Sequence, residues 1–405
     1  MASTKVDPVE VKLVDNLKRA TGDKPNIFIF VVDSLRQDYL SPYNSKVTFT
    51  PNIESFGRES VVLKNAFTPY GGTVLAQPSI WTGTMQIHKQ YVEPFYPMNA
   101  LQKLIETDDY QTYITIDPVL KIIVKPSSSI IELDKDTPSW QSLDLNTSLR
   151  ELRAKMEART DKSRPVFAYT QAQNIHIHVL NRERREGPPA FEFEGFDSYY
   201  SSQVKHMDEG MGEFIQYLKD SGQYDNSIVV LTSDHGDSMG EGGRWGHATW
   251  IFPEVLRIPI IIHLPTKYQK SLYWDPQSIA FSHDITPSLY YMLGHRPIVQ
   301  NDVFGKPLFT LTQKEQENYQ TRSYMVASSY GPSYGILSDN GRALFISDAA
   351  NSKDYFFNLD DDPEGKRNLV TGEARAENET LIRRYVQAIN SFYSFDPDQS
   401  ESGGK

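Results

Sequence analysis

The sequence predicts an α/β protein built on a mostly parallel central sheet with helices on both faces. Three apolar runs, NIFIFVVD, RPVFAYTQ and NSIVVLTSDHGD, each follow turn residues and each end in polar groups. Continuous runs of this kind are typical of strands that are buried on both faces. Helical patterns lie between the runs, and this alternation of strand and helix predicts a parallel sheet.

The elements follow one another in a regular order. The three runs predict strands at 26–33, 164–171 and 226–232, and YQTYITID and RIPIIIHLP predict two more, at 110–117 and 257–265. The predicted helices are 97–107, 144–160 and 198–222, and the last of these ends in a glycine stop signal.

The pattern of residues changes along the chain, and these changes predict four segments. Val9, Leu13 and Leu17 mark one side of a short amphipathic helix near the N-terminus. After about residue 310, short strands separated by Gly, Asn and Asp turns predict an antiparallel meander, which a last helix follows. The predicted segments are an N-terminal helical segment (1–24), an α/β catalytic core (25–310), a smaller C-terminal antiparallel-sheet subdomain of α+β type (311–395) and a disordered tail (396–405).

Composition excludes several classes of function. The chain has 405 residues, 39% of them hydrophobic, and a net charge of -11 from 41 basic and 52 acidic residues. This balance argues against nucleic acid as a partner, because such binding needs clustered Lys and Arg. The sequence contains no Cys, which excludes disulfides, thiolate metal sites and cysteine nucleophiles. A metal would therefore be held by oxygen and imidazole ligands.

The sequence shows neither a membrane span nor a signal peptide. Its longest apolar runs fall far short of the ~20 residues that a transmembrane helix needs. The chain is expected to be soluble as written, either in the cytoplasm or as the extracytoplasmic soluble domain of a longer membrane-anchored protein. The sequence leaves this choice and the oligomeric state open.

Chemically useful side chains follow two of the predicted strands. Asp33 ends the first strand, and Asp234 and His235 come directly after the strand at 226–232. In open parallel sheets, ligands gather at the carboxyl ends of the strands. Asp33 taken alone could equally be a helix N-cap, and the Asp-His pair alone could be an ordinary turn. Together they predict a carboxylate-rich site with one imidazole, suited to one Zn or Mn ion, with Ca or Mg as alternatives.

The stretch YGGTVLAQPSIWTG supplies a candidate nucleophile, Thr73. Its hydroxyl is almost never ionised at neutral pH and attacks only beside a base or a metal ion. We expect Thr73 to be both a metal ligand and the attacking group. Gly71 and Gly72 would permit a close backbone approach, and Pro78 would fix the turn beyond.

Three histidines are candidates for handling the group being transferred. A glycine-rich loop, GEGGRWGHATW, delivers His247, and QNIHIHV offers His176 and His178, which share one face if that segment is extended. Such side chains could stabilise the other oxygens of the transferred group or protonate the leaving group. The catalytic candidates are Thr73, His176 and His247. The alternative for 176 and 178 is a pair of hydrogen-bonded surface imidazoles.

These motifs resemble the sulfatase and alkaline phosphatase superfamily over roughly residues 25–370. PNIFIFVVDSLRQDYL resembles its first strand and metal carboxylate, and SDHGDSMGEGGRWGHATW resembles its second metal segment. FSHDITPSLYYMLG and KDYFFNLDDDPEGKRNL resemble later sulfatase segments. The sulfatase signature runs from its nucleophile to a Thr-Gly ten residues later, and counting back from Gly83 gives Thr73. The resemblance implies an alkaline-phosphatase/sulfatase-like fold, with Asp33, Thr73, Asp234 and His235 as metal ligands.

The departures from the sulfatase pattern point to one branch of the superfamily. Sulfatases convert a Cys or Ser to formylglycine, whereas this chain has Thr73, and Gln77 replaces the signature Arg. The usual Lys-x-His is absent near Asp117. A Thr nucleophile of this kind resembles the phosphotransferase branch, which acts on lipid head groups and other phosphoesters. Two-metal relatives carry an Asp four residues before a His, whereas Ala172 and Asn174 stand four residues before His176 and His178, so one tightly held metal is expected, with any second bound weakly. The expected substrate-binding residues are Gly72, Gln77, His178 and Arg244.

The sequence therefore leaves three functions in order of preference. The first is a metal-dependent phosphoester hydrolase or phosphotransferase that forms a phospho-threonine at Thr73, with a phosphoester, including a lipid head group, as its substrate. The second is a sulfatase-like hydrolase of sulfuric esters. The third is a catalytically silent binding domain with the same fold, which the retained ligand set disfavours.

Overall fold

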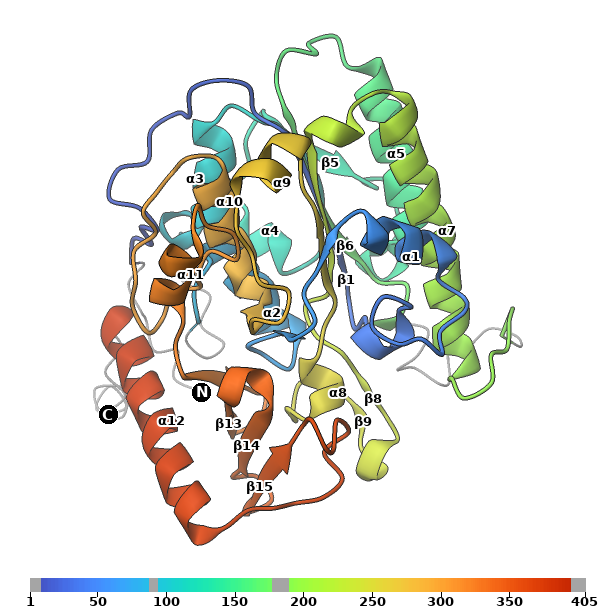
Figure 1. The fold of residues 1–405 in the computed structure, drawn as a ribbon. Helices are drawn as coiled ribbons and strands as arrows, with labels where there is room; N and C mark the ends of the chain where they lie inside the picture. The colour runs from blue at the N-terminus through green and yellow to red at the C-terminus, as the bar shows by residue number, and fades with distance from the viewer. Residues whose placement is uncertain (1–8, 87–93, 177–188, 395–405) are drawn as a thin grey trace, which may run out of the picture.

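A computed structural model describes residues 9–86, 94–176 and 189–394 (Figure 1). Its central sheet has seven strands in the order β2-β10-β7-β1-β6-β4-β5. The strands are β1 (Asn26–Val32), β2 (Val61–Val62), β4 (Gln111–Thr115), β5 (Ile130–Leu133), β6 (Val166–Ala172), β7 (Ser227–Thr232) and β10 (Ile260–His263). Parallel pairs join β7, β1, β6, β4 and β5, while β10 lies antiparallel to β7. The prediction of a mostly parallel sheet is confirmed.

Helices cover both faces of this sheet (Figure 1). One layer contains α1 (Pro51–Arg58), α5 (Leu145–Ala158) and α7 (Ser198–Asp220), and the other contains α2 (Thr73–Thr82), α3 (Ala100–Thr107) and α10 (Ile285–Met292). Strand β1 serves both layers because its side chains alternate between the faces. Phe28, Phe30 and Val32 join the core under α5 and α7, and the intervening residues join the core on the α2 side.

A four-stranded antiparallel sheet forms a separate layer near the C-terminus, as predicted. Its strands are β12 (Ser323–Ala327), β13 (Ser333–Ser338), β14 (Ala343–Asp348) and β15 (Lys353–Asn358), and α12 (Gly372–Phe392) packs on them. The shorter elements are β3 (Ala66–Phe67), β8 (Ser238–Met239), β9 (Trp245–Gly246), β11 (Ala280–Phe281), α4 (Leu120–Ile123), α8 (Pro253–Leu256), α9 (Thr266–Ser271) and α11 (Gln313–Tyr319). The exact segment boundaries 25–310 and 311–395 stay predictions.

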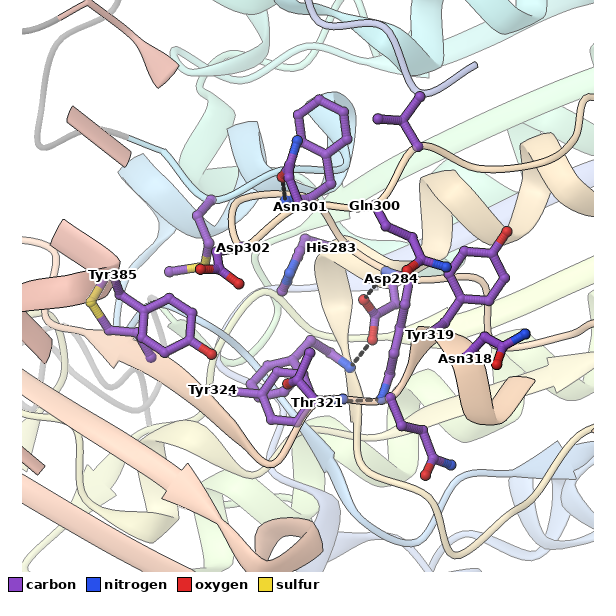
Figure 2. Close-up of a pocket in the computed structure, with 18 residues that line it drawn as sticks. His283, Asp284, Gln300, Asn301, Asp302, Asn318, Tyr319, Thr321, Tyr324 and Tyr385 are labelled. Carbon is purple, nitrogen blue, oxygen red and sulfur yellow. Dashed lines mark hydrogen bonds between the residues drawn. The ribbon is translucent and has the colours of Figure 1, made fainter. Parts of the chain in front are cut away.

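A cavity of about 320 Å³ lies where the C-terminal layer meets the α/β core (Figure 2). His283 and Asp284 of the core line it together with Tyr324 and Tyr385 of the C-terminal layer. Lys306 Nζ donates to the Tyr324 hydroxyl at 2.8 Å, which ties the C-terminal layer to the core. The Tyr385 hydroxyl donates to the Ser323 carbonyl and joins α12 to β12 within the C-terminal layer.

The predicted N-terminal helix is wrong over the described residues, because 9–25 contain no helix. Val11 donates its backbone N–H to the Pro97 carbonyl, and the Leu13 carbonyl accepts from Val299 N. The segment therefore bonds to other parts of the chain instead of to itself. Val11, Leu13 and Val14 are buried, which is not the spacing of one helix face. The predicted tail at 396–405 lies outside the described residues.

Among the described helices, none combines the length and the apolar character needed to cross a bilayer.

Candidate active site

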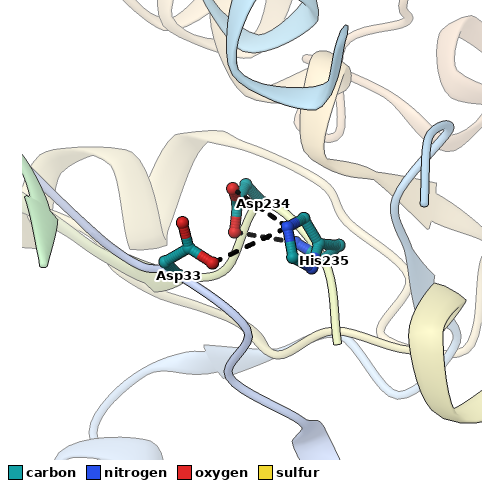
Figure 3. A group of neighbouring side chains, drawn as sticks. All are labelled: Asp33, Asp234 and His235. Atoms are coloured by element: carbon teal, nitrogen blue, oxygen red, sulfur yellow. Dashed lines mark hydrogen bonds and ion pairs between the residues drawn. The ribbon is translucent and has the colours of Figure 1, made fainter. Parts of the chain in front are cut away.

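The sheet order places the two predicted metal carboxylates side by side. Strands β1 and β7 are parallel neighbours, and Asp33 and Asp234 follow their carboxyl ends. Asp33, Asp234 and His235 each offer one ligand atom, and these atoms lie within 4.8 Å of one another (Figure 3). His235 Nε2 is 3.6 Å from Asp33 Oδ1 and 3.6 Å from Asp234 Oδ2. All three side chains are buried, so their charges are poorly screened by water.

Thr73 completes this cluster. Its Oγ1 donates toward Asp33 Oδ2 at 3.2 Å and lies 3.0 Å from His235 Nε2. A hydroxyl has a single hydrogen, so it cannot donate to both neighbours at once. Thr73 is the first residue of α2, whose N-terminal end favours negative charge. The four predicted metal ligands are therefore brought together; their roles remain predictions.

The tautomer of His235 follows from its other ring nitrogen. His235 Nδ1 is 2.8 Å from the Gly236 carbonyl, which can only accept a hydrogen bond. Nδ1 therefore carries the hydrogen when the ring is neutral, and the lone pair of Nε2 faces Thr73 and the carboxylates. An imidazole oriented in this way is ready to coordinate a cation.

The environment shifts the pKa values of Asp33 and Asp234 in opposite directions. Burial raises the pKa of Asp33, but His176, His235 and His247 outweigh it and hold that pKa well below the usual value. Burial and the negative charge of Asp33 raise the pKa of Asp234. For His235, burial lowers the pKa, but Asp234 and Asp33 outweigh it, so the net shift is upward. A bound cation would relieve this crowding of buried negative charge.

The glycine pair before Thr73 allows close packing of two distant loops. A Cβ on Gly71 would lie 2.6 Å from the Trp250 carbonyl oxygen, and the Gly72 carbonyl accepts from Ser329 Oγ at 2.8 Å. Neither Gly71 nor the extended Gly72 has a left-handed φ, so the requirement at Gly71 is space and not a special backbone angle. The expectation for Pro78 is wrong: it lies inside α2, which runs unbroken from Thr73 to Thr82.

Two of the three candidate histidines approach the cluster. The His247 ring lies 4.1 Å from the His235 ring and 5.2 Å from the His176 ring, measured between centroids. His176 comes after β6 and a turn at 174–175 and has a helical backbone, so the expected extended face is absent at this residue. His176 Nδ1 donates to Gln173 Oε1 at 3.1 Å, so this hydrogen bond does not engage the Nε2 atom of the ring. His178 lies outside the described residues.

Sequence reasoning missed four side chains that fix the cluster. Gln173 Nε2 donates to Asp33 Oδ2 at 3.0 Å, and Gln171 Nε2 donates to Asp234 Oδ2 at 3.1 Å. Ser34 Oγ donates to Asp33 Oδ1 at 2.9 Å. His247 Nδ1 lies 3.4 Å from Asp237 Oδ1. The missed signal was period two in YTQAQN, which puts both amides on the face that looks toward the aspartates.

The other predicted substrate-binding residues have different surroundings. Gln77 is fully buried in α2, and neither side-chain atom has a hydrogen-bond partner in the described structure. Arg244 forms an ion pair with Glu254 at 2.9 Å and stacks over the Phe252 ring at 3.6 Å. Contact of either residue with a substrate stays a prediction.

Replacing Asp237 by asparagine is expected to lower kcat about tenfold and to change KM little. The buried carboxylate accepts from His247 Nδ1, so it holds that ring in one tautomer and one orientation. Asp225→Asn, at an exposed position, is the control. An unchanged kcat in Asp237→Asn would remove Asp237 from the site.

Asp117 should reduce stability at neutral pH. Burial raises its pKa to about 6, above the ~3.9 of an unfolded chain. The folded protein binds the extra proton between these values, so stability falls as pH rises from about 4 to 6 and the penalty then stays constant. Asp117→Asn retains the acceptor for Leu120 N and removes the charge. Urea unfolding should show a gain of about 3 kcal/mol above pH 6 that vanishes near pH 4. A gain independent of pH would contradict this.

The residues present fit a divalent cation. Two carboxylates, an imidazole Nε2 with its lone pair turned inward and a threonine hydroxyl form a buried set with mixed oxygen and nitrogen donors. Such a set suits zinc or manganese better than calcium, which prefers oxygen alone.

Comparisons with known proteins agree with this fold. The chain is similar to a 2-O GAG sulfatase (TM-score 0.68, 14% identity, 93% of this chain and 96% of that one). It is also similar to the phosphonate monoester hydrolase of Agrobacterium radiobacter (TM-score 0.61, 13% identity, 91% and 96%). An arylsulfatase from Clostridium perfringens is 22% identical over 472 aligned positions, which cover 90% of this chain and 94% of that protein.

The fold is that of the alkaline phosphatase superfamily. Within it, the Sulfatase family model matches residues 25–295, which is more than half of the chain. The chain therefore belongs to the sulfatase family.

Proposed function

We propose that this chain is a metal-dependent hydrolase or transferase of sulfuric or phosphoric esters in which Thr73 is the attacking group. The observation that carries the proposal is the position of Thr73 Oγ1, between Asp33 Oδ2 and His235 Nε2 at the start of α2. The hydroxyl meets a buried ligand set on one side and a helix N-terminus on the other. A transferred tetrahedral oxyanion would be stabilised from both sides.

The relatives favour sulfuric esters. The family model is that of the sulfatases, and the arylsulfatase match spans nearly the full length of both chains. The sulfuric-ester reading thus has more support from the relatives than the phosphoester reading that the sequence suggested.

One feature of the site favours phosphoric esters as the second candidate. Sulfatases, which this chain resembles, use a formylglycine made from Cys or Ser, whereas position 73 of this chain is Thr. A threonine side chain carries a methyl group on Cβ and cannot yield that aldehyde. An alcohol nucleophile suits transfer of a phosphoryl group through a phospho-threonine.

Each residue of the site has its own role in the proposed reaction. Asp33, Asp234, His235 and Thr73 would hold the cation, which would supply Lewis-acid polarisation of the ester. Thr73 Oγ1 forms the new bond to phosphorus or sulfur and loses its proton to solvent, because the low pKa of Asp33 makes that carboxylate a poor base. The bond to the leaving alcohol breaks, and that oxygen takes a proton from His247 or His176. Water then attacks phosphorus or sulfur and returns a proton to that histidine, while the bond to Thr73 Oγ1 breaks and the Thr73 oxygen takes a proton from solvent.

A matched substrate panel tests the proposal. Purified, metal-loaded protein is assayed with an aryl sulfate, an aryl phosphate and a phosphodiester that share one leaving group. Turnover of the sulfate at the highest kcat/KM assigns a sulfuric ester hydrolase, and turnover of a phosphate substrate assigns the second candidate. No turnover of any of the three, with a fully loaded metal site, would overturn the proposal in favour of a silent domain.

A further inference from the structure

A basic pocket lies at the amino ends of strands β1, β6 and β7, whereas Asp33 and Asp234 follow the carboxyl ends of β1 and β7. It has a volume of about 720 Å³, within the range of small-molecule sites. Its walls are segments that each precede a strand: 19–26 before β1, 156–165 before β6 and 221–226 before β7. Strand β1 has seven residues, so at about 3.3 Å per residue the pocket and Asp33 are about 20 Å apart. The pocket is thus separate from the active site.

The lining of this pocket is net positive, whereas the chain as a whole is net negative. Five basic side chains line it, against two acidic ones. The basic residues are Arg19, Lys24, Arg159, Lys162 and Arg164, and the acidic residues are Asp23 and Glu157. Glu157 already pairs with Arg153, which is outside the lining, at 2.9 Å. The whole chain has a net charge of -11, so this concentration of cations is a local feature.

Neighbouring carboxylates anchor part of this wall without neutralising it. Arg19 and Arg164 share one carboxylate, that of Asp109, at 2.9 and 3.0 Å. Lys24 reaches Asp108 at 3.5 Å. Two guanidinium groups on one carboxylate leave a positive excess that is held in a fixed position. Such preorganisation lowers the entropy cost of binding an anion.

Arg159 and Lys162 lack an acidic partner among the described residues. Arg159 donates through one terminal nitrogen to the Arg164 carbonyl at 2.9 Å, and its buried Nε has no hydrogen-bond partner there. Lys162 forms no ion pair with any described residue. A guanidinium with an unused donor beside an ammonium group suits phosphate or sulfate oxygens, which accept charge-assisted hydrogen bonds.

We propose that this pocket binds an oligoanionic ligand bearing phosphate or sulfate groups, with Arg159 and Lys162 as the principal contacts. The space and the five cations suit more than one such group. The proposal stands on the pocket alone, so it holds whichever ester the active site takes.

Binding is measured by titration calorimetry on metal-loaded protein with two probes, a sulfated oligosaccharide and inorganic phosphate. Arg159→Gln/Lys162→Gln should weaken binding of the better probe at least about tenfold and leave aryl-ester turnover unchanged. The control Lys46→Gln/Lys314→Gln removes the same charge at exposed positions and should bind as the wild type does. Lys162→Gln alone breaks no described contact, so its smaller loss of affinity separates binding from folding.

The two probes distinguish the sources of the ligand. Tighter binding of the oligosaccharide, weakened by added salt, supports a polymeric or multiply charged ligand. Phosphate binding that depends on Arg159 and Lys162 supports a small phosphorylated one. Equal affinities of both probes for the wild type and the double variant would overturn the proposal, even if the active site proves catalytic.

Discussion

Replacing Thr73 by alanine is expected to lower kcat at least about a thousandfold on whichever ester the protein turns over, while the fold and the bound metal persist. The variant loses the only hydroxyl that contacts both Asp33 and His235 among the described residues. Loss of a nucleophile removes the covalent route itself, so the effect exceeds that of losing a positioning group. Asp33, Asp234 and His235 remain to hold the cation.

The measurement combines steady-state kinetics with metal analysis of the same samples. Thr73→Ser is the matched control, because it keeps the hydroxyl at the start of α2 and removes only a methyl group. It should retain a measurable part of the activity, whereas Thr73→Ala should not. Quenching the wild-type reaction and weighing the intact protein should show the added phosphoryl or sulfuryl group on Thr73. Undiminished turnover by Thr73→Ala would exclude the covalent mechanism.

The sequence was sufficient to predict the parts of the site that depend on strand ends. Asp33 and Asp234 each follow a buried apolar run, and parallel strands that are neighbours in the sheet bring such residues together. Placing Thr73 beside them rested on the need of a hydroxyl nucleophile for a base or a metal and on the family resemblance, since no local pattern links residues 73 and 235. The structure adds that Thr73 begins a helix, which a glycine pair and an internal proline conceal in the sequence.

Contacts between distant segments could not be predicted in this way. The segment at 9–25 has helical spacing, but its backbone bonds to Pro97 and Val299, so tertiary contacts override the local pattern. The period-two spacing of Gln171 and Gln173 puts both amides on one face, but spacing alone does not say what that face touches, and Asp237 has no such spacing. Their importance lies in which atoms they touch, and that depends on how β6 and the loop after β7 meet.

Removing the metal is expected to abolish turnover and to destabilise the fold together. Asp33 and Asp234 are buried next to each other, and without a cation their repulsion is opposed mainly by the nearby histidines. A ligand present at 100 times its Kd stabilises a protein by about 2.7 kcal/mol, so a chelator should lower the free energy of unfolding by that order. Denaturant unfolding before and after chelation measures this loss, and kcat is followed in parallel.

Reconstitution then separates the candidate metals. The imidazole of His235 presents its Nε2 lone pair to the cluster, and a nitrogen ligand favours zinc or manganese over calcium or magnesium. Zinc or manganese should therefore restore both kcat and stability, whereas calcium or magnesium should restore less of each. Asp234→Asn is the matched variant, because it keeps the shape of the side chain and weakens a ligand. If the chelated protein keeps its full turnover and stability, the Asp33-Asp234-His235 cluster does not hold a metal.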